Sequence, residues 1–166
     1  MNDSVSYVLD ANVFIEAARR YYAFDLAPGF WQSLIDCAAA EQIRSIDKVA
    51  DELAKGKDEL ADWAENNFAD AFASTDSNDV TQSYAEIITW VTGQVQFSGA
   101  AKADFAQGAD GWLVAFARAK GYTVVTHEEL APDVRRKVPI PNVCNAFGVP
   151  YINTFQMLRA LGVRFN

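Results

Sequence analysis

Two patterns of hydrophobic and polar positions alternate along the chain. Short apolar runs rich in β-branched residues predict strands buried on both faces. These strands are residues 5–9, 43–46, 122–126 and 149–152. Between them, apolar positions spaced three and four residues apart predict helices. The predicted helices are residues 13–22, 29–41, 48–55, 58–67, 80–95, 110–120, 141–148 and 154–161.

Turn and capping residues mark the ends of several predicted elements. Gly121 follows helix 110–120 at the position where a left-handed glycine commonly ends a helix. We expect Asp47 and Asn153 to cap the helices that follow them, because short polar side chains accept hydrogen bonds from the first helical amides. Residues 97–109 carry no decisive pattern, so a short helix and a loop both remain open.

Strands separated by helices predict an α/β fold around a mostly parallel sheet. The 166 residues, of which 51% are hydrophobic, show no repeat or linker, so we expect a single domain over residues 1–166. In such sheets, ligands bind beyond the carboxyl ends of the strands. Strand 5–9 leads directly into Asp10, and strand 122–126 ends at Thr126, so we expect a site there.

Charge and composition narrow the classes of function. A net charge of −8 argues against broad, nonspecific binding of nucleic acid, which usually needs a basic face, although an enzyme that uses bound cations remains open. The chain has no run of about 18 apolar residues and no signal-peptide pattern, so we expect no membrane contact. Cys37 and Cys144 form neither a disulfide framework nor a metal-binding spacing. We therefore expect a reduced, cytoplasmic protein.

Four acids follow or begin elements that an α/β sheet would bring together. Asp10 comes directly after an apolar strand, where a buried carboxylate is costly unless it is paired, so it either caps the next helix or ligates a metal. Glu52 lies at the edge of its helix's apolar stripe, and it is either a surface acid or part of a site. Asp110 opens an apolar helix, where it either interacts with the helix dipole or joins the site. Glu128 is either a loop acid or a ligand, and Asp104 and Glu129 are rival candidates.

Carboxylates that lie close together repel one another unless a cation joins them. Ligation by oxygen alone suits Mg²⁺ or Mn²⁺. These ions activate water and stabilise in-line displacement at phosphorus. The constellation of Asp10, Glu52, Asp110 and Glu128 therefore predicts metal-assisted hydrolysis of phosphodiester bonds.

Three stretches, "YVLDANVFIEA", "VADEL" and "ADGWLVAFARAKGYTVVTHEE", resemble the PIN-domain ribonucleases, the superfamily that includes the VapC-type bacterial toxins. The resemblance implies a three-layer α/β/α fold and an Mg²⁺- or Mn²⁺-dependent endoribonuclease. It also implies that Asp10, Glu52 and Asp110 are metal-site acids, with Thr126 and Glu128 at the strand end. Glu128 departs from the family, which more often has aspartate or asparagine there. The tail from Lys137 onward resembles an uncharacterised PIN-like branch.

The resemblance also suggests a substrate and partners. We expect Asn12 and Thr126, beside the acids, to contact an RNA substrate, and the basic spot Arg135, Arg136 and Lys137 either neutralises its phosphates or is simply solvated. Toxin status would imply an antitoxin protein as a partner, and a homodimer remains open. The aromatic residues could stack on bases, but we expect core packing instead, and we expect the single histidine in a solvated loop. These aromatic residues are Tyr21, Tyr22, Phe24, Phe30 and Trp31, and the histidine is His127.

Two other classes of function compete with the ribonuclease. One is a PIN-like binding or scaffold protein that has lost catalysis. The other is a haloacid-dehalogenase-type phosphatase, which also begins with a strand ending in aspartate. That family has a second aspartate two residues later, where this chain has Asn12, so we rank it lower.

Overall fold

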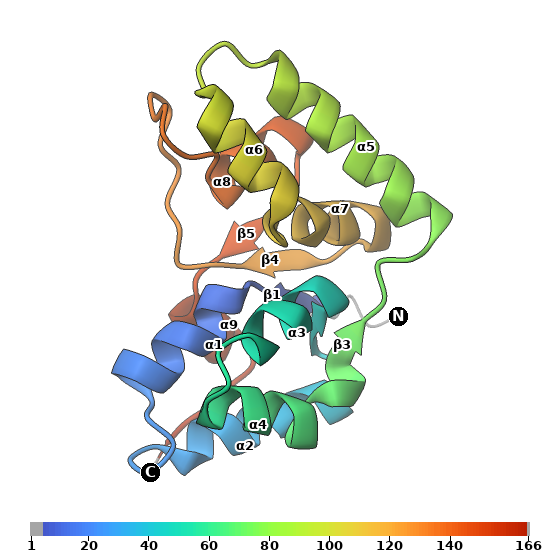
Figure 1. Ribbon diagram of the computed structural model, residues 1–166. Coiled ribbons are helices and arrows are strands. Elements are labelled where there is room, and N and C mark those ends of the chain that lie inside the picture. The colour runs from blue at the N-terminus through green and yellow to red at the C-terminus, as the bar shows by residue number, and fades with distance from the viewer. Residues whose placement is uncertain (1–4, 166) are drawn as a thin grey trace.

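The computed structural model describes residues 5–165 and contains a five-stranded sheet in the order β3-β2-β1-β4-β5 (Figure 1). All neighbouring strands run parallel, and Val8 in the central strand lies opposite Arg44 on one side and Val124 on the other. The α/β fold with a central parallel sheet is therefore confirmed. The strands are β1 (Tyr7–Leu9), β2 (Ile43–Ile46), β3 (Phe72–Ala73), β4 (Thr123–Val125) and β5 (Tyr151–Ile152).

Helices cover both faces of this sheet and make a three-layer architecture. In Figure 1, α5 to α8 lie above the sheet, while α1 to α4 and α9 lie below it. The α-helices are α1 (Ala11–Glu16), α2 (Pro28–Ala39), α3 (Asp47–Ala54), α4 (Glu59–Asn67), α5 (Asn78–Gly93), α6 (Gly99–Gln107), α7 (Asp110–Lys120), α8 (Ile140–Phe147) and α9 (Thr154–Ala160). A π-helical segment, η1 (Ala17–Tyr21), extends α1, and a 3₁₀ turn, η2 (Ala69–Ala71), precedes β3. Within residues 5–165, no helix is both long enough and apolar enough to cross a membrane.

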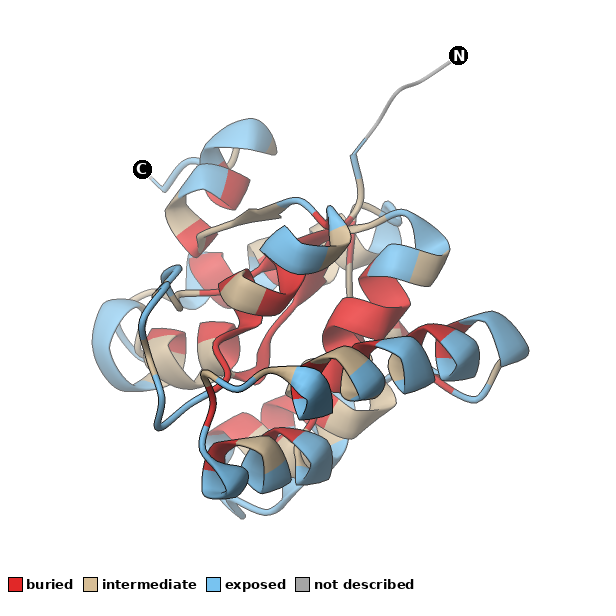
Figure 2. Cartoon of the chain, turned by 90° about the horizontal axis from the view of Figure 1, so that it is seen from above, coloured by how far each residue is buried: buried red, intermediate tan, exposed pale blue. Residues whose placement is uncertain are grey.

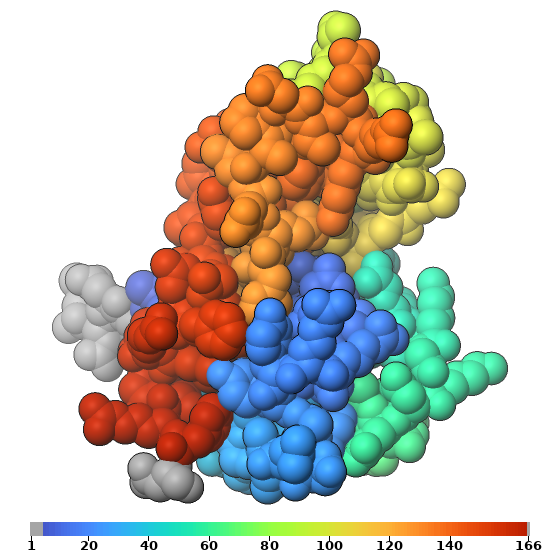
Figure 3. Space-filling model, turned by 90° about the vertical axis from the view of Figure 1, so that its left-hand side faces the viewer, coloured from blue at the N-terminus to red at the C-terminus, as the bar shows by residue number. Residues whose placement is uncertain are grey.

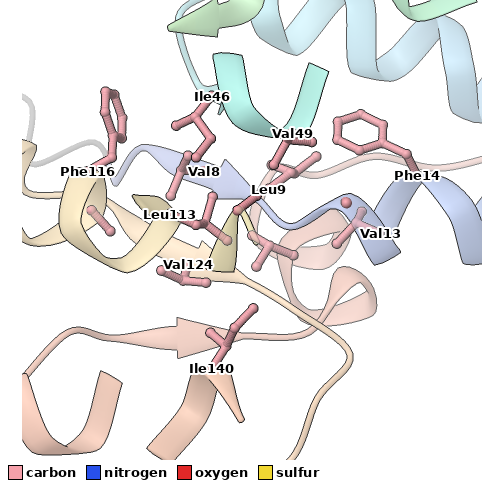
Figure 4. Close-up of a cluster of buried hydrophobic side chains, with 14 of the residues drawn as sticks. Val8, Leu9, Val13, Phe14, Ile46, Val49, Leu113, Phe116, Val124 and Ile140 are labelled. Carbon is pink, nitrogen blue, oxygen red and sulfur yellow. The ribbon is translucent and has the colours of Figure 1, made fainter. Parts of the chain in front are cut away.

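The core is centred on β1, which is covered by helices on both faces. Val8 and Leu9 are fully buried, and Figure 4 shows them between Ile46 and Val49 on one side and Leu113 on the other. Figure 2 shows that the buried residues concentrate in the sheet and in the inward faces of the helices. An unbroken apolar strand is what a doubly covered parallel sheet requires, because neither face meets water.

Two predicted helix ends are confirmed in detail. Gly121 ends α7 with a φ of 77°, a left-handed conformation that glycine adopts without steric cost. Asn153 caps α9, and Gln156 completes a capping box, since each side chain accepts a hydrogen bond from the other's backbone amide. The bounds of α7 are those predicted from the sequence.

Other predictions need correction. Asp47 is the first residue of α3 instead of its cap, and its carboxylate accepts hydrogen bonds from the amide and hydroxyl of Thr75 at 3.2 and 2.9 Å. The first helix begins at Ala11, two residues earlier than predicted. The undecided stretch 97–109 contains α6. Strand β3 was not predicted, because two residues are too few to show a period.

Candidate functional site

Asp10 lies directly after the central strand, at the carboxyl edge of the sheet. Its backbone amide donates to the carbonyl of Val125 at 3.0 Å, so the parallel pairing with β4 continues up to this residue. The carboxylate is buried, with the residue only 2% exposed, and Oδ2 accepts a hydrogen bond from the Thr126 hydroxyl at 3.1 Å. Asp10 occupies the N-cap position of α1, but its side chain makes no capping hydrogen bond there, and the carboxylate is held by the Thr126 hydroxyl instead.

Thr126 connects Asp10 to Glu128. Its hydroxyl donates to Asp10 and accepts from the Glu128 backbone amide at 3.1 Å. The Glu128 side chain folds back, and Oε1 accepts from the Ile140 amide at 3.1 Å and lies 3.2 Å from Lys137 Nζ. A single buried hydroxyl therefore fixes the positions of two acids that come from the ends of β1 and β4.

Asp110 and Glu52 reach this edge from two helices. Asp110 is the first residue of α7, and Glu52 Oε1 accepts from the backbone amide of Ala109 at 3.2 Å, so α3 meets the start of α7 here. A cavity of about 270 Å³ opens beside Asp110, and its charged lining consists of Asp104, Asp110, Arg136 and Lys137. A larger cavity of about 660 Å³ lies between α3 and α4, and none of the four predicted acids lines it.

The acids act on one another electrostatically. Burial, followed by the charges of Asp110 and Glu128, raises the pKa of Asp10 well above its usual value, against the opposing effect of the Thr126 hydrogen bond. Burial, then Glu128 and Glu52, raises the pKa of Asp110 to about 7, while Lys137 lowers it. All four predicted acids therefore belong to one electrostatic cluster, in which ionised carboxylates are costly without a cation.

The donor set fits a hard divalent cation in its chemistry, since it consists of carboxylate oxygens and one hydroxyl. Within residues 5–165, however, no three acids, histidines or cysteines stand close enough together to hold an ion as they are arranged. Glu52 and Glu128 instead accept backbone hydrogen bonds, and Glu128 is also paired with Lys137. Metal ligation by the four acids therefore stays a prediction, and it requires side-chain movement.

The other predicted contact residues surround this cluster. Thr126 is buried, and Asn12 is half-buried in the first turn of α1. Arg135 and Arg136 are exposed, as are the rival acids Asp104 and Glu129. Figure 3 looks onto this side of the molecule, with the segment after β4 in orange and the first helix in blue.

Four of the five aromatic residues serve packing as predicted, whereas Tyr21 is 50% exposed and lies outside the core. Phe30 and Trp31 are buried, and they stack on Tyr22 and Phe24 respectively, with ring centroids 4.4 and 4.1 Å apart. The prediction that His127 is solvated needs correction. This residue is half-buried, its Nε2 lies 2.9 Å from the Thr154 hydroxyl, and its ring packs near Tyr21 and Phe155.

The pairing of Lys137 with Glu128 was not found from the sequence. The sequence does contain a hint of this pairing, because Lys137 is the last of three consecutive basic residues and closely follows the acidic strand end. Only the return of the chain, which places the Ile140 amide against Glu128, shows which of the three cations faces the acids.

The layers, the parallel sheet and the acids at its carboxyl edge define a PIN-like fold. Among solved structures of this fold are VapBC2 from Rickettsia felis bound to a DNA fragment from its promoter (18% identity, TM-score 0.53) and FitAcB from Neisseria gonorrhoeae (20% identity, TM-score 0.56). Each comparison covers 90% of this chain and 98% of the other. FitAB bound to an IR36 DNA fragment matches at 19% identity with a TM-score of 0.53, covering 89% of this chain and 94% of the other.

The predicted resemblance to VapC-type PIN domains is therefore confirmed at the level of the fold. The chain belongs to the family described as "Domain of unknown function (DUF4411)", which matches residues 7–165. No curated protein sequence matches this chain.

Proposed function

We propose that this protein is an Mg²⁺- or Mn²⁺-dependent endoribonuclease. The observation that carries the proposal is the fully buried Asp10, held by Thr126 at the carboxyl edge of a PIN-like sheet and coupled to Asp110 and Glu128. A folded protein does not normally bury acids against one another without a compensating cation. Such clusters are typical of functional sites, because catalysis needs groups whose charge the environment has shifted.

The residues would divide the work as follows. Asp10, Asp110, Glu128 and Glu52 would hold the cation, and Thr126 would keep the Asp10 carboxylate in a fixed orientation. The bound cation would supply an activated water and charge stabilisation at phosphorus. The exposed Arg135 and Arg136, on the segment that carries Lys137, would attract the phosphates of an RNA strand to an otherwise acidic protein.

The test is RNA cleavage by metal-stripped protein, measured on a total RNA pool with Mn²⁺, with Mg²⁺ and with EDTA. Wild type should cleave only with metal, and Asp10→Asn should lose at least about 100-fold in rate, because even residues that merely support metal ligands contribute about 10–100-fold. Asp104→Asn is the matched control, since Asp104 is an exposed acid that lines the same cavity as Asp110. Equal metal-dependent activity in wild type and Asp10→Asn would remove Asp10 from the catalytic site.

We further propose that the nuclease is the toxin of a toxin–antitoxin pair. The support is the likeness of fold to VapBC2 and FitAB, whose structures were determined bound to DNA fragments. A free nuclease of this kind would harm the cell, so an antitoxin protein should cover the acid cluster, with an arginine or lysine that pairs with the carboxylates. Expressed alone in bacteria, wild type should slow growth, and Asp10→Asn at equal protein level should not. Harmless expression of a demonstrably active wild type would leave a selective or housekeeping nuclease.

One observation favours the competing function, a PIN-like binding protein without catalysis. Glu128 is already neutralised by Lys137, and no three acids in the described part of the chain are arranged to share an ion. A scaffold of this kind would bind RNA or a protein partner without cleaving RNA under any metal condition, and the cleavage experiment separates the two functions. A homodimer and a cytoplasmic location remain predictions.

A further inference from the structure

Lys137 contacts the acid cluster, although its side chain is also partly exposed to solvent. Its Nζ lies 3.2 Å from Glu128 Oε1, and it lines the same cavity as Asp110. The two partners differ in exposure, because the Glu128 side chain is 12% exposed whereas that of Lys137 is 55% exposed. Glu128 therefore needs a partner inside the protein, but Lys137 can return its ammonium group to water at little cost.

The backbone around Lys137 holds it in this place. Before it, the Val134 carbonyl accepts from the Gln96 side chain at 2.8 Å, and the Arg135 carbonyl accepts from the Ser98 amide at 2.8 Å. After it, Val138 is buried and the Ile140 amide donates to Glu128 itself. The segment that carries Lys137 is therefore fixed on both sides of it, which places this lysine beside the acids.

We propose that Lys137 is a built-in counter-cation, which neutralises Glu128 in the metal-free protein and leaves it when a divalent cation binds. This inference rests on the proposed metal site. It explains why Glu128 is not arranged to share an ion with the other acids, since its carboxylate is turned toward Lys137 and the Ile140 amide, whereas Glu52 is held separately by the Ala109 amide. Lys137 is accordingly a positioning residue that competes with the metal, whereas Arg135 and Arg136 remain the candidates for RNA contact.

The competition sets the affinity of the site for metal. A cation that must be displaced costs part of the metal's binding free energy, and its charge repels the incoming ion at short range. Removing it should tighten metal binding while destabilising the metal-free protein, because Glu128 then keeps only its backbone partner. An ordinary surface lysine would produce neither effect.

The test is titration calorimetry with Mn²⁺ on metal-stripped protein, for wild type, Lys137→Met, Lys137→Arg and Arg136→Met. Lys137→Met keeps most of the length of the side chain without its charge, and the dissociation constant of this variant for Mn²⁺ should fall about fivefold or more. Lys137→Arg keeps the charge and should stay close to wild type. Arg136→Met is the matched control, since Arg136 lines the same cavity but forms no ion pair among residues 5–165. It should change the constant less than about twofold, because exposed charges are screened.

Thermal unfolding supplies a readout that does not depend on activity. The rise in the unfolding midpoint on adding saturating Mn²⁺ should be about 2 °C or more larger in Lys137→Met than in wild type. If Mn²⁺ binds wild type and Lys137→Met with equal affinity, the proposed role of Lys137 is wrong, although the metal site stands. The same follows if Arg136→Met increases the affinity as much as Lys137→Met does. If neither wild type nor Lys137→Met binds Mn²⁺ at millimolar concentration, the proposed metal site fails and this inference fails with it.

Discussion

Replacing Asp110 with asparagine should make the metal-free protein more stable at neutral and alkaline pH. Burial and the charges of Glu128 and Glu52 raise the pKa of Asp110 from 3.8 to about 7. Between these two values, the folded protein holds a proton that the unfolded chain has released, so stability falls as the pH rises. The cost is absent below about pH 4, grows up to about pH 7 and is complete above that.

The size of the effect follows from the same two values. At about 1.4 kcal/mol for each pH unit, the step from 3.8 to about 7 corresponds to about 4 kcal/mol. Because Asp10 and Glu128 share this cluster, part of that cost belongs to them, so we expect Asp110→Asn to gain about 2–4 kcal/mol at pH 8. Asparagine has nearly the same shape, so packing should change little.

The assay is urea unfolding in EDTA from pH 5 to pH 8.5, followed by circular dichroism. Wild type should lose stability across this range, and Asp110→Asn should lose less, although burial of Asp10 still raises the pKa of that second acid. Asp104→Asn, an exposed acid that lines the same cavity, should stay within about 0.5 kcal/mol of wild type. A flat wild-type profile, together with an Asp110→Asn variant no more stable than wild type at pH 8, would refute the electrostatic argument.

Three further predictions follow from other parts of the structure. Thr126→Val should cost about 1–3 kcal/mol in urea unfolding, because it leaves the Glu128 amide and Asp10 Oδ2 without their shared hydroxyl, and unchanged stability would contradict that link. Replacing both Arg135 and Arg136 with glutamine should make the slope of log binding constant against log salt concentration less steep by about 1.4 for single-stranded RNA, as measured by fluorescence anisotropy. An unchanged slope would mean that both arginines are only solvated. Gly121→Ala should cost about 1 kcal/mol in thermal unfolding, since the φ of 77° is unfavourable for alanine although its Cβ would meet no neighbouring atom. A neutral result there would show that the end of α7 can adopt another conformation.

The sequence alone determined the features that depend on neighbouring residues. The apolar run before Asp10, the bounds of α7, the glycine at its end and the Asn153 cap were all predicted, because strand period, helix period and capping are local properties. Asp110 at the start of a helix and Thr126 at the end of a strand were also predicted to meet, because a parallel sheet brings these ends to one edge.

Tertiary structure decided the rest, because it depends on residues that are distant in the chain. Neither the β3-β2-β1-β4-β5 order nor the two-residue strand β3 carries a local signal. The hydrogen-bond partners of Glu52 and Asp10 carry no local signal either. The Glu52 carboxylate binds an amide 57 residues away, and the hydroxyl partner of Asp10 is 116 residues away. The sequence placed Lys137 in a basic spot, but only the packing of its segment against Glu128 shows that this lysine belongs to the acid cluster. A side chain's partner depends on which backbone lies across from it, and the folded chain alone specifies that.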